Sequence, residues 1–173
     1  MKIVWKVILL LIVCLATWHA ATTPWVPVLD DANLIFHEAG HVIFSPFGEL
    51  LYTAGGSIFQ ILLPLLLVIP FVRKQDYFGA LLMLWWAGEN MIGVGRYIAD
   101  ARAQELELIG GEHDFALILS RWPHVMRYDT AIGGAVRDVG ITIMLVSIAV
   151  CIYIIFLQSK DRKSESVESV VGH

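Results

Sequence analysis

The segment LDDANLIFHEAGHVIFSPFG, residues 29–48, contains two histidines four positions apart, with a glutamate directly after the first. Residues four apart share one face of a helix, so His37 and His41 can bring two imidazole nitrogens to one metal ion. Glu38 lies one position further round, close enough to act on a metal-bound water, which is the mechanical basis of the His-Glu-x-x-His motif. The spacing therefore predicts a Zn²⁺ site with His37 and His41 as ligands and Glu38 as the catalytic base.

The same segment also predicts its own local structure. Asp30 and Asp31 are good N-caps, and Pro46 disfavours helix at Ser45, so the helix between them should have about 14 residues, or ~21 Å at 1.5 Å per residue. This is too short to cross a bilayer, which predicts a re-entrant or interfacial helix. Two histidines and a glutamate are costly at membrane depth unless they pair or bind an ion. Hydrogen-bonded core histidines are the alternative to the metal site.

The chain around the motif is unusually apolar. Of its 173 residues, 57% are hydrophobic and 16% are charged, whereas soluble domains average about half and a quarter. Apolar runs at 3–19, 50–72, 77–95 and 139–158 predict an all-α polytopic membrane protein of about four transmembrane helices. We expect one helical domain over 1–158 and a disordered polar tail over 159–173.

The first run could also be a cleaved signal peptide. Trp18 and His19 stand where cleavage needs a small residue, so an uncleaved anchor is favoured. The net charge of −4 gives no indication of nucleic-acid binding, and the expected partners are the lipid bilayer and a membrane-protein or peptide substrate.

Charge predicts the orientation of the bundle. All five lysines lie at the amino terminus, in the 73–76 turn or in the tail, and residues 7–72 contain neither lysine nor arginine. By the positive-inside rule both termini are cytoplasmic, in a cytoplasmic (inner or plasma) membrane. Residues 20–49 and 96–138 then lie on the outer face, and the active site opens toward that face.

A catalytic zinc usually has a third protein ligand and one open position. His113 is the favoured candidate, because Gly110-Gly111 marks a turn and His113 then opens an amphipathic stretch that Pro123 ends. Asp114 could orient a ligating imidazole or serve as a third ligand, and its structural alternative is a helix cap.

Two further carboxylates remain open as third ligands. Asp100 lies at the outer end of the 77–95 run, and its structural alternative is a salt bridge with Arg96 or Arg102. Glu89 lies deeper in the same run, where a carboxylate is unusual and could line the site.

FHEAGHVIF resembles the zinc-binding helix of the membrane-embedded metallopeptidases of the site-two protease family. AGGSIFQILLPLLL, residues 54–67, loosely resembles the small-residue segment that begins the next helix in that family. The resemblance covers roughly residues 32–67. It departs from the family in having no Leu-Asp-Gly segment for the third ligand, although Asp100 would match the family's use of an aspartate, and in the outer-face position of the motif. It implies His37 and His41 as ligands, Glu38 as base and a peptide bond as substrate.

The expected chemistry is metal-assisted hydrolysis. Zinc would lower the pKa of its bound water and polarise the scissile carbonyl, and Glu38 would take a proton from that water and deliver it to the leaving amine. The alternative is a non-catalytic membrane protein with a structural or sensory zinc site. Such a site would have four protein ligands and would not need a glutamate beside the first histidine.

Overall fold

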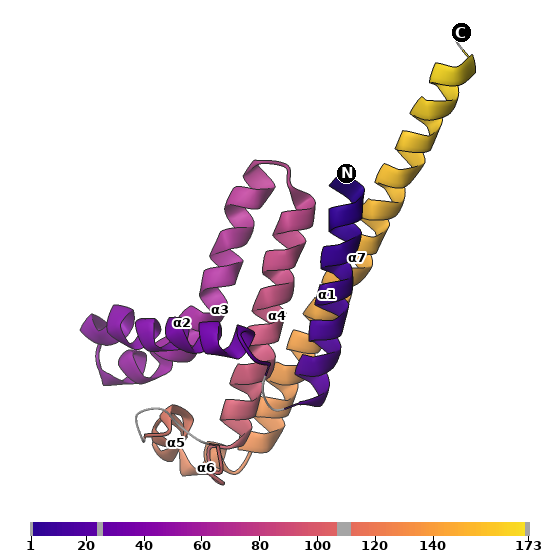
Figure 1. The fold of residues 1–173 in the computed structure, drawn as a ribbon. Coiled ribbons are helices and arrows are strands. Elements are labelled where there is room, and N and C mark those ends of the chain that lie inside the picture. The colour runs from indigo at the N-terminus through magenta and orange to yellow at the C-terminus, as the bar shows by residue number, and fades with distance from the viewer. Residues whose placement is uncertain (1, 24–25, 107–111, 172–173) are drawn as a thin grey trace.

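The computed structural model describes residues 2–23, 26–106 and 112–171, with the side chains of those between 3 and 160, and helices joined by short turns make up most of these ranges (Figure 1). Those ranges contain no β-strand, so the predicted all-α class is confirmed. The helices are α1 (Lys2–Thr22), α2 (Leu29–Phe44), the 3₁₀ turn η1 (Ser45–Phe47), α3 (Glu49–Arg73), α4 (Tyr77–Ala99), α5 (Asp114–Ser120), α6 (Pro123–Met126) and α7 (Asp129–Val171).

Three of these helices are long and apolar enough to cross a membrane: Ile3–Thr22, Glu49–Arg73 and Asp129–Lys160. The fourth predicted span, 77–95, lies in α4, which is of similar length. Among the described helices, α4 is not one of the three that are long and apolar enough to cross a membrane. Its apolar character is interrupted by Glu89 and Asn90, which are 2% and 1% exposed. Because α4 packs against α7 and α3, these polar side chains face the inside of the bundle.

Glycines allow α4 and α7 to approach closely. A Cβ added to Gly88 would lie 2.7 Å from the carbonyl oxygen of Gly140, and one added to Gly95 would lie 2.6 Å from that of Gly133. The two pairs are seven residues apart on each helix, which keeps them on one face of each antiparallel partner. Close backbone contact between small residues is a usual way for apolar helices to associate in membranes.

The predicted short helix is present as α2, which lies across α3 and α4 rather than along them (Figure 1). It contacts the first turns of α3 and the middle of α4. Its N-cap is Val28, not an aspartate. The carboxylates of Asp30 and Asp31, in the first turn, instead accept hydrogen bonds from the backbone N–H groups of Val26 and Val28. They therefore still satisfy the N-terminal backbone donors, but from inside the helix.

The two ends of the bundle differ. Lys6 donates to Gln158 at 3.0 Å and lies 5.1 Å from the ring centre of Phe78, so the starts of α1 and α4 meet α7 at one end. α5 and α6 lie at the opposite end, beside the end of α4 and the start of α7 (Figure 1). Beyond Gln158, α7 continues to Val171, whereas the sequence predicts a disordered tail there. The segment contains no proline or glycine before Gly172, so no residue in it breaks the helix.

Candidate metal centre

The motif residues form a group that could hold a metal ion. The ligand atoms of His37, Glu38 and His41 all lie within 4.8 Å of one another on α2. His37 is buried, His41 is half-buried and Glu38 is exposed. The geometry therefore supports the prediction that these three residues could bind a metal ion.

A carboxylate from α5 lies against both histidines. The Oδ2 atom of Asp114 is 3.0 Å from Nε2 of His37 and 3.3 Å from Nε2 of His41. In a tetrahedral zinc site with bonds of about 2.0–2.1 Å, neighbouring ligand atoms are about 3.3 Å apart. Both distances match those between neighbouring ligand atoms on one small cation.

Both imidazoles are oriented by hydrogen bonds on their other nitrogen. Nδ1 of His41 lies 2.8 Å from the backbone carbonyl oxygen of Tyr52, and Nδ1 of His37 lies 3.2 Å from Oε1 of Gln60. Both of these oxygens accept hydrogen bonds, so a neutral ring that donates from Nδ1 presents its Nε2 lone pair toward Asp114. Two lone pairs and a carboxylate oxygen repel one another unless a cation lies among them, whether a proton or a metal ion. Fixing of the ring by an outer acceptor is typical of metal-binding histidines.

Close packing of α2 on α3 shapes the pocket around His37. A Cβ added to Gly56 would lie 2.6 Å from Nε2 of His37, so only glycine leaves room for the imidazole at that position. Gly40 and Gly55 make the corresponding backbone contact one turn away. The small residues that follow the motif in the sequence therefore allow the His37 ring to lie against α3.

The structure places His113 apart from the histidine pair. His113 caps α5, and its Nδ1 accepts a hydrogen bond from the N–H of Ala116 at 3.3 Å. Its ring stacks on Tyr97 with 4.2 Å between ring centres, and Nε2 lies 3.3 Å from Oδ2 of Asp100. That contact is electrostatic rather than an aligned hydrogen bond, because Nε2 finds no acceptor at suitable geometry. The first two candidates for the third ligand, His113 and Asp100, thus contact each other.

Asp100 has a second set of contacts. Its carboxylate accepts hydrogen bonds from the N–H groups of Glu105 at 3.0 Å and Leu106 at 3.1 Å, which ties down the chain after α4. The salt bridge predicted as its alternative was with Arg96 or Arg102. Arg102 instead pairs with Asp129 at 2.7 Å, and Arg96 donates to the carbonyl oxygen of Ala20. The hydrogen bonds to Asp129 raise the pKa of the Arg102 guanidinium above its usual value.

Glu89 also lies away from the metal group. It accepts a hydrogen bond from Nδ2 of Asn33 at 2.8 Å, and Oδ1 of Asn33 accepts one from the indole of Trp86 at 2.8 Å. Asn33 precedes His37 by one turn of α2, so this network joins α2 to α4 next to the site. Of the four predicted third ligands, Asp114 alone contacts both His37 and His41.

Two side chains that contact the motif residues or Asp114 were not predicted from the sequence. Gln60 orients His37, and Tyr97 accepts a hydrogen bond from the N–H of Asp114 at 2.9 Å while its ring contacts His37 edge-on. A signal for Gln60 was present: it is an amide in an otherwise apolar stretch, where a polar side chain is costly without a partner. Tyr97 resembled any aromatic residue at the end of an apolar run.

We expect Gln60→Leu to weaken zinc affinity roughly 10- to 100-fold, because His37 would lose the acceptor that orients its ring. Competition against a chromophoric zinc chelator in detergent measures this directly. Gln158→Leu is the matched control, since Gln158 bonds Lys6 at the far end of the bundle. Equal affinity for the two variants would show that Gln60 does not orient a ligand.

No known protein-family model, curated protein or solved structure matches this chain. The resemblance to the site-two protease family therefore rests on the motif residues alone.

Proposed function

We propose that this protein is a membrane-embedded zinc metallopeptidase that hydrolyses peptide bonds of membrane or membrane-proximal proteins. The observation that carries the proposal is the convergence of two imidazole nitrogens and one carboxylate oxygen, with Glu38 beside them. Two histidines and a carboxylate are a known ligand set for hydrolytic zinc, and it leaves a position open.

The ligands proposed for zinc are His37, His41 and Asp114. When bound, zinc would supply Lewis acidity to a water molecule and to a substrate carbonyl. The role of the protein is to hold the two rings through Gln60 and the Tyr52 carbonyl, and to bring Asp114 in from α5. Asp114 is thus proposed as the third zinc ligand, for which His113 was the favoured candidate from the sequence.

Glu38 is suited to proton transfer. It is exposed, and it makes no hydrogen bond or ion pair with any residue that the structure describes, so its carboxylate is available to a water molecule and to substrate. A carboxylate within 4.8 Å of the ligand nitrogens can take a proton during attack and deliver it to the leaving amine.

We further propose that α4 completes a four-span bundle with both termini in the cytoplasm. In support, Lys6, the α3–α4 turn and Gln158 gather at one end, while α5, α6 and the end of α4 lie at the other (Figure 1). The positive-inside rule makes the lysine-bearing end cytoplasmic in an inner or plasma membrane. Substrate then reaches the site from the outer side.

A structural or sensory metal site is the second candidate, and one observation favours it. The Glu38 carboxylate lies within 4.8 Å of the ligand atoms of the same histidines, so Glu38 could ligate the metal ion together with His37 and His41. Closed sites with four protein ligands are the structural type. Exposure of Glu38 favours the open, hydrolytic arrangement.

Removal and restoration of the metal tests the peptidase. The full-length protein is reconstituted into vesicles with a mixture of membrane proteins, and new amino termini are labelled and identified by mass spectrometry. We expect new termini with zinc, their loss after chelation and their return when zinc is added back. Protein that binds zinc one to one and still produces no new termini would contradict the peptidase and favour the structural site.

A further inference from the structure

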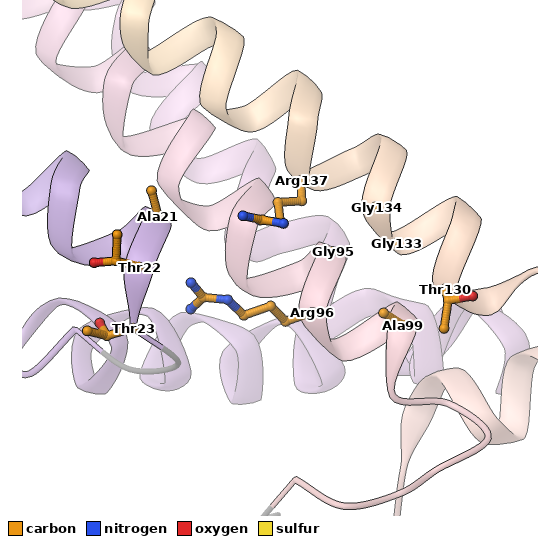
Figure 2. Close-up of a pocket in the computed structure, with 10 residues that line it drawn as sticks. All are labelled: Ala21, Thr22, Thr23, Gly95, Arg96, Ala99, Thr130, Gly133, Gly134 and Arg137. Atoms are coloured by element: carbon orange, nitrogen blue, oxygen red, sulfur yellow. The ribbon is translucent and has the colours of Figure 1, made fainter.

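A pocket lies among the end of α1, the last turns of α4 and the first turns of α7. Its volume is about 460 Å³, and it is enclosed by residues 21–23 at the end of α1, one face of α4 and the first turns of α7 (Figure 2). Two arginines line it, Arg96 from α4 and Arg137 from α7, and no acidic residue does. Figure 2 shows both side chains extending toward the end of α1.

The two arginines differ in how their charge is satisfied. Arg96 donates to the carbonyl oxygen of Ala20 and interacts with the charges of Asp30 and Glu89. Arg137 is exposed and makes no hydrogen bond or ion pair with any described residue, including Asp138, the next residue in the chain. The charges of Arg96 and Arg137 also oppose each other. Two like charges held at one pocket, one of them without a partner, create a site that an anion would stabilise.

The other polar groups of the pocket contribute little positive character. The hydroxyl groups of Thr22 and Thr23 donate to the carbonyl oxygens of Trp18 and His19. The first residue of α7 is Asp129, whose carboxylate accepts a hydrogen bond from the N–H of Thr130 and pairs with Arg102. The attraction for an anion therefore comes from the two guanidinium groups, whose planar forks fit the oxygens of a phosphate.

The position of the pocket along the bundle indicates the depth of its ligand. The apolar span of α1 ends at Thr22 and that of α7 begins at Asp129, so the pocket opens where both spans meet the membrane surface. Phospholipid phosphates lie at that level. We propose that the Arg96–Arg137 pocket binds a phosphate group, either that of an anionic phospholipid headgroup or free phosphate.

Binding of phosphatidylglycerol labelled on an acyl chain, measured by fluorescence polarisation with the full-length protein in detergent, tests the site. Diacylglycerol with the same label lacks the phosphate and sets the non-specific background. We expect Arg137→Gln to weaken phosphatidylglycerol binding roughly five- to tenfold, as the loss of one basic group at a membrane surface would. Arg127→Gln is the matched control, because Arg127 stacks on Tyr128 outside the pocket.

Inorganic phosphate, added at constant ionic strength, distinguishes the two sources. Displacement of the lipid by inorganic phosphate, lost in Arg137→Gln, would identify a site for phosphate itself. Lipid binding that depends on Arg137 and resists inorganic phosphate would identify the headgroup as the ligand. Equal lipid binding by Arg137→Gln and Arg127→Gln, with unchanged circular dichroism, would overturn the proposal.

Discussion

Glu38→Gln should abolish hydrolysis while the purified protein keeps its zinc. Glutamine has the shape of glutamate but cannot accept a proton, and general-base catalysis of this kind contributes roughly 10²- to 10⁴-fold. Since Glu38 has no partner among the described residues, the substitution leaves no buried group unpaired and the fold should be unchanged. The rate of appearance of new amino termini and the zinc content, measured on the same preparation, check both halves of the prediction.

Glu49→Gln is the control for that experiment. Glu49 is also exposed, and its ion pair with Arg121 at 2.9 Å is a surface contact. Exposed pairs contribute only about 0–1 kcal/mol, so the control should keep both zinc and activity. Loss of zinc in Glu38→Gln would instead show that Glu38 is a ligand, and the closed structural site would replace the peptidase.

Asp114→Ala should lose zinc nearly as completely as His37→Ala, whereas His113→Ala should retain it. The reason is geometric: Oδ2 of Asp114 lies 3.0 and 3.3 Å from the two ligand nitrogens, and His113 contacts Asp100 and Tyr97 instead. Removal of one of three ligands leaves two, which is too few for a stable zinc site. Metal content after dialysis, determined by elemental mass spectrometry, is the measurement.

Two companion variants separate ligation from helix capping. Asp114→Asn keeps the size of the side chain and an oxygen but removes the charge, so zinc affinity should fall while α5 stays in place. Asp100→Asn replaces one of the two oxygens that accept from the backbone of residues 105 and 106, so it should weaken those contacts without removing zinc. Zinc lost from His113→Ala or Asp100→Asn and kept in Asp114→Ala would reverse the assignment of the third ligand.

Much of the local architecture could be predicted from sequence because it depends on local rules. The four-residue spacing of His37 and His41 places them on one face of any helix, and Pro46 ends that helix nearby, where η1 replaces it. The apolar run lengths predicted helices that could cross a membrane, and three of them meet that description. The run lengths did not show that α4 falls outside this group, although Glu89 within it already stood out as a carboxylate in an apolar run.

The sequence alone could not decide between His113 and Asp114 as the third ligand. His113 and Asp114 are adjacent, and both are chemically suitable. His113 is the N-cap of α5, with φ −99° and ψ 105°, so its ring turns back toward Tyr97, while Asp114 is the first helical residue. The position at which α5 begins thus decides which of the two side chains reaches α2. No pattern in the sequence predicts in which direction each side chain points.

What the sequence alone determined about this protein is the chemistry carried by one helix: two imidazoles and a carboxylate at a spacing that suits a metal ion. Only the tertiary structure decided what surrounds them, namely Asp114 from 77 residues away, Gln60 from α3 and the glycine that makes room for His37. The physical reason is that helix periodicity is set by neighbouring residues, whereas contacts between helices depend on backbone approach and side-chain direction over the whole bundle.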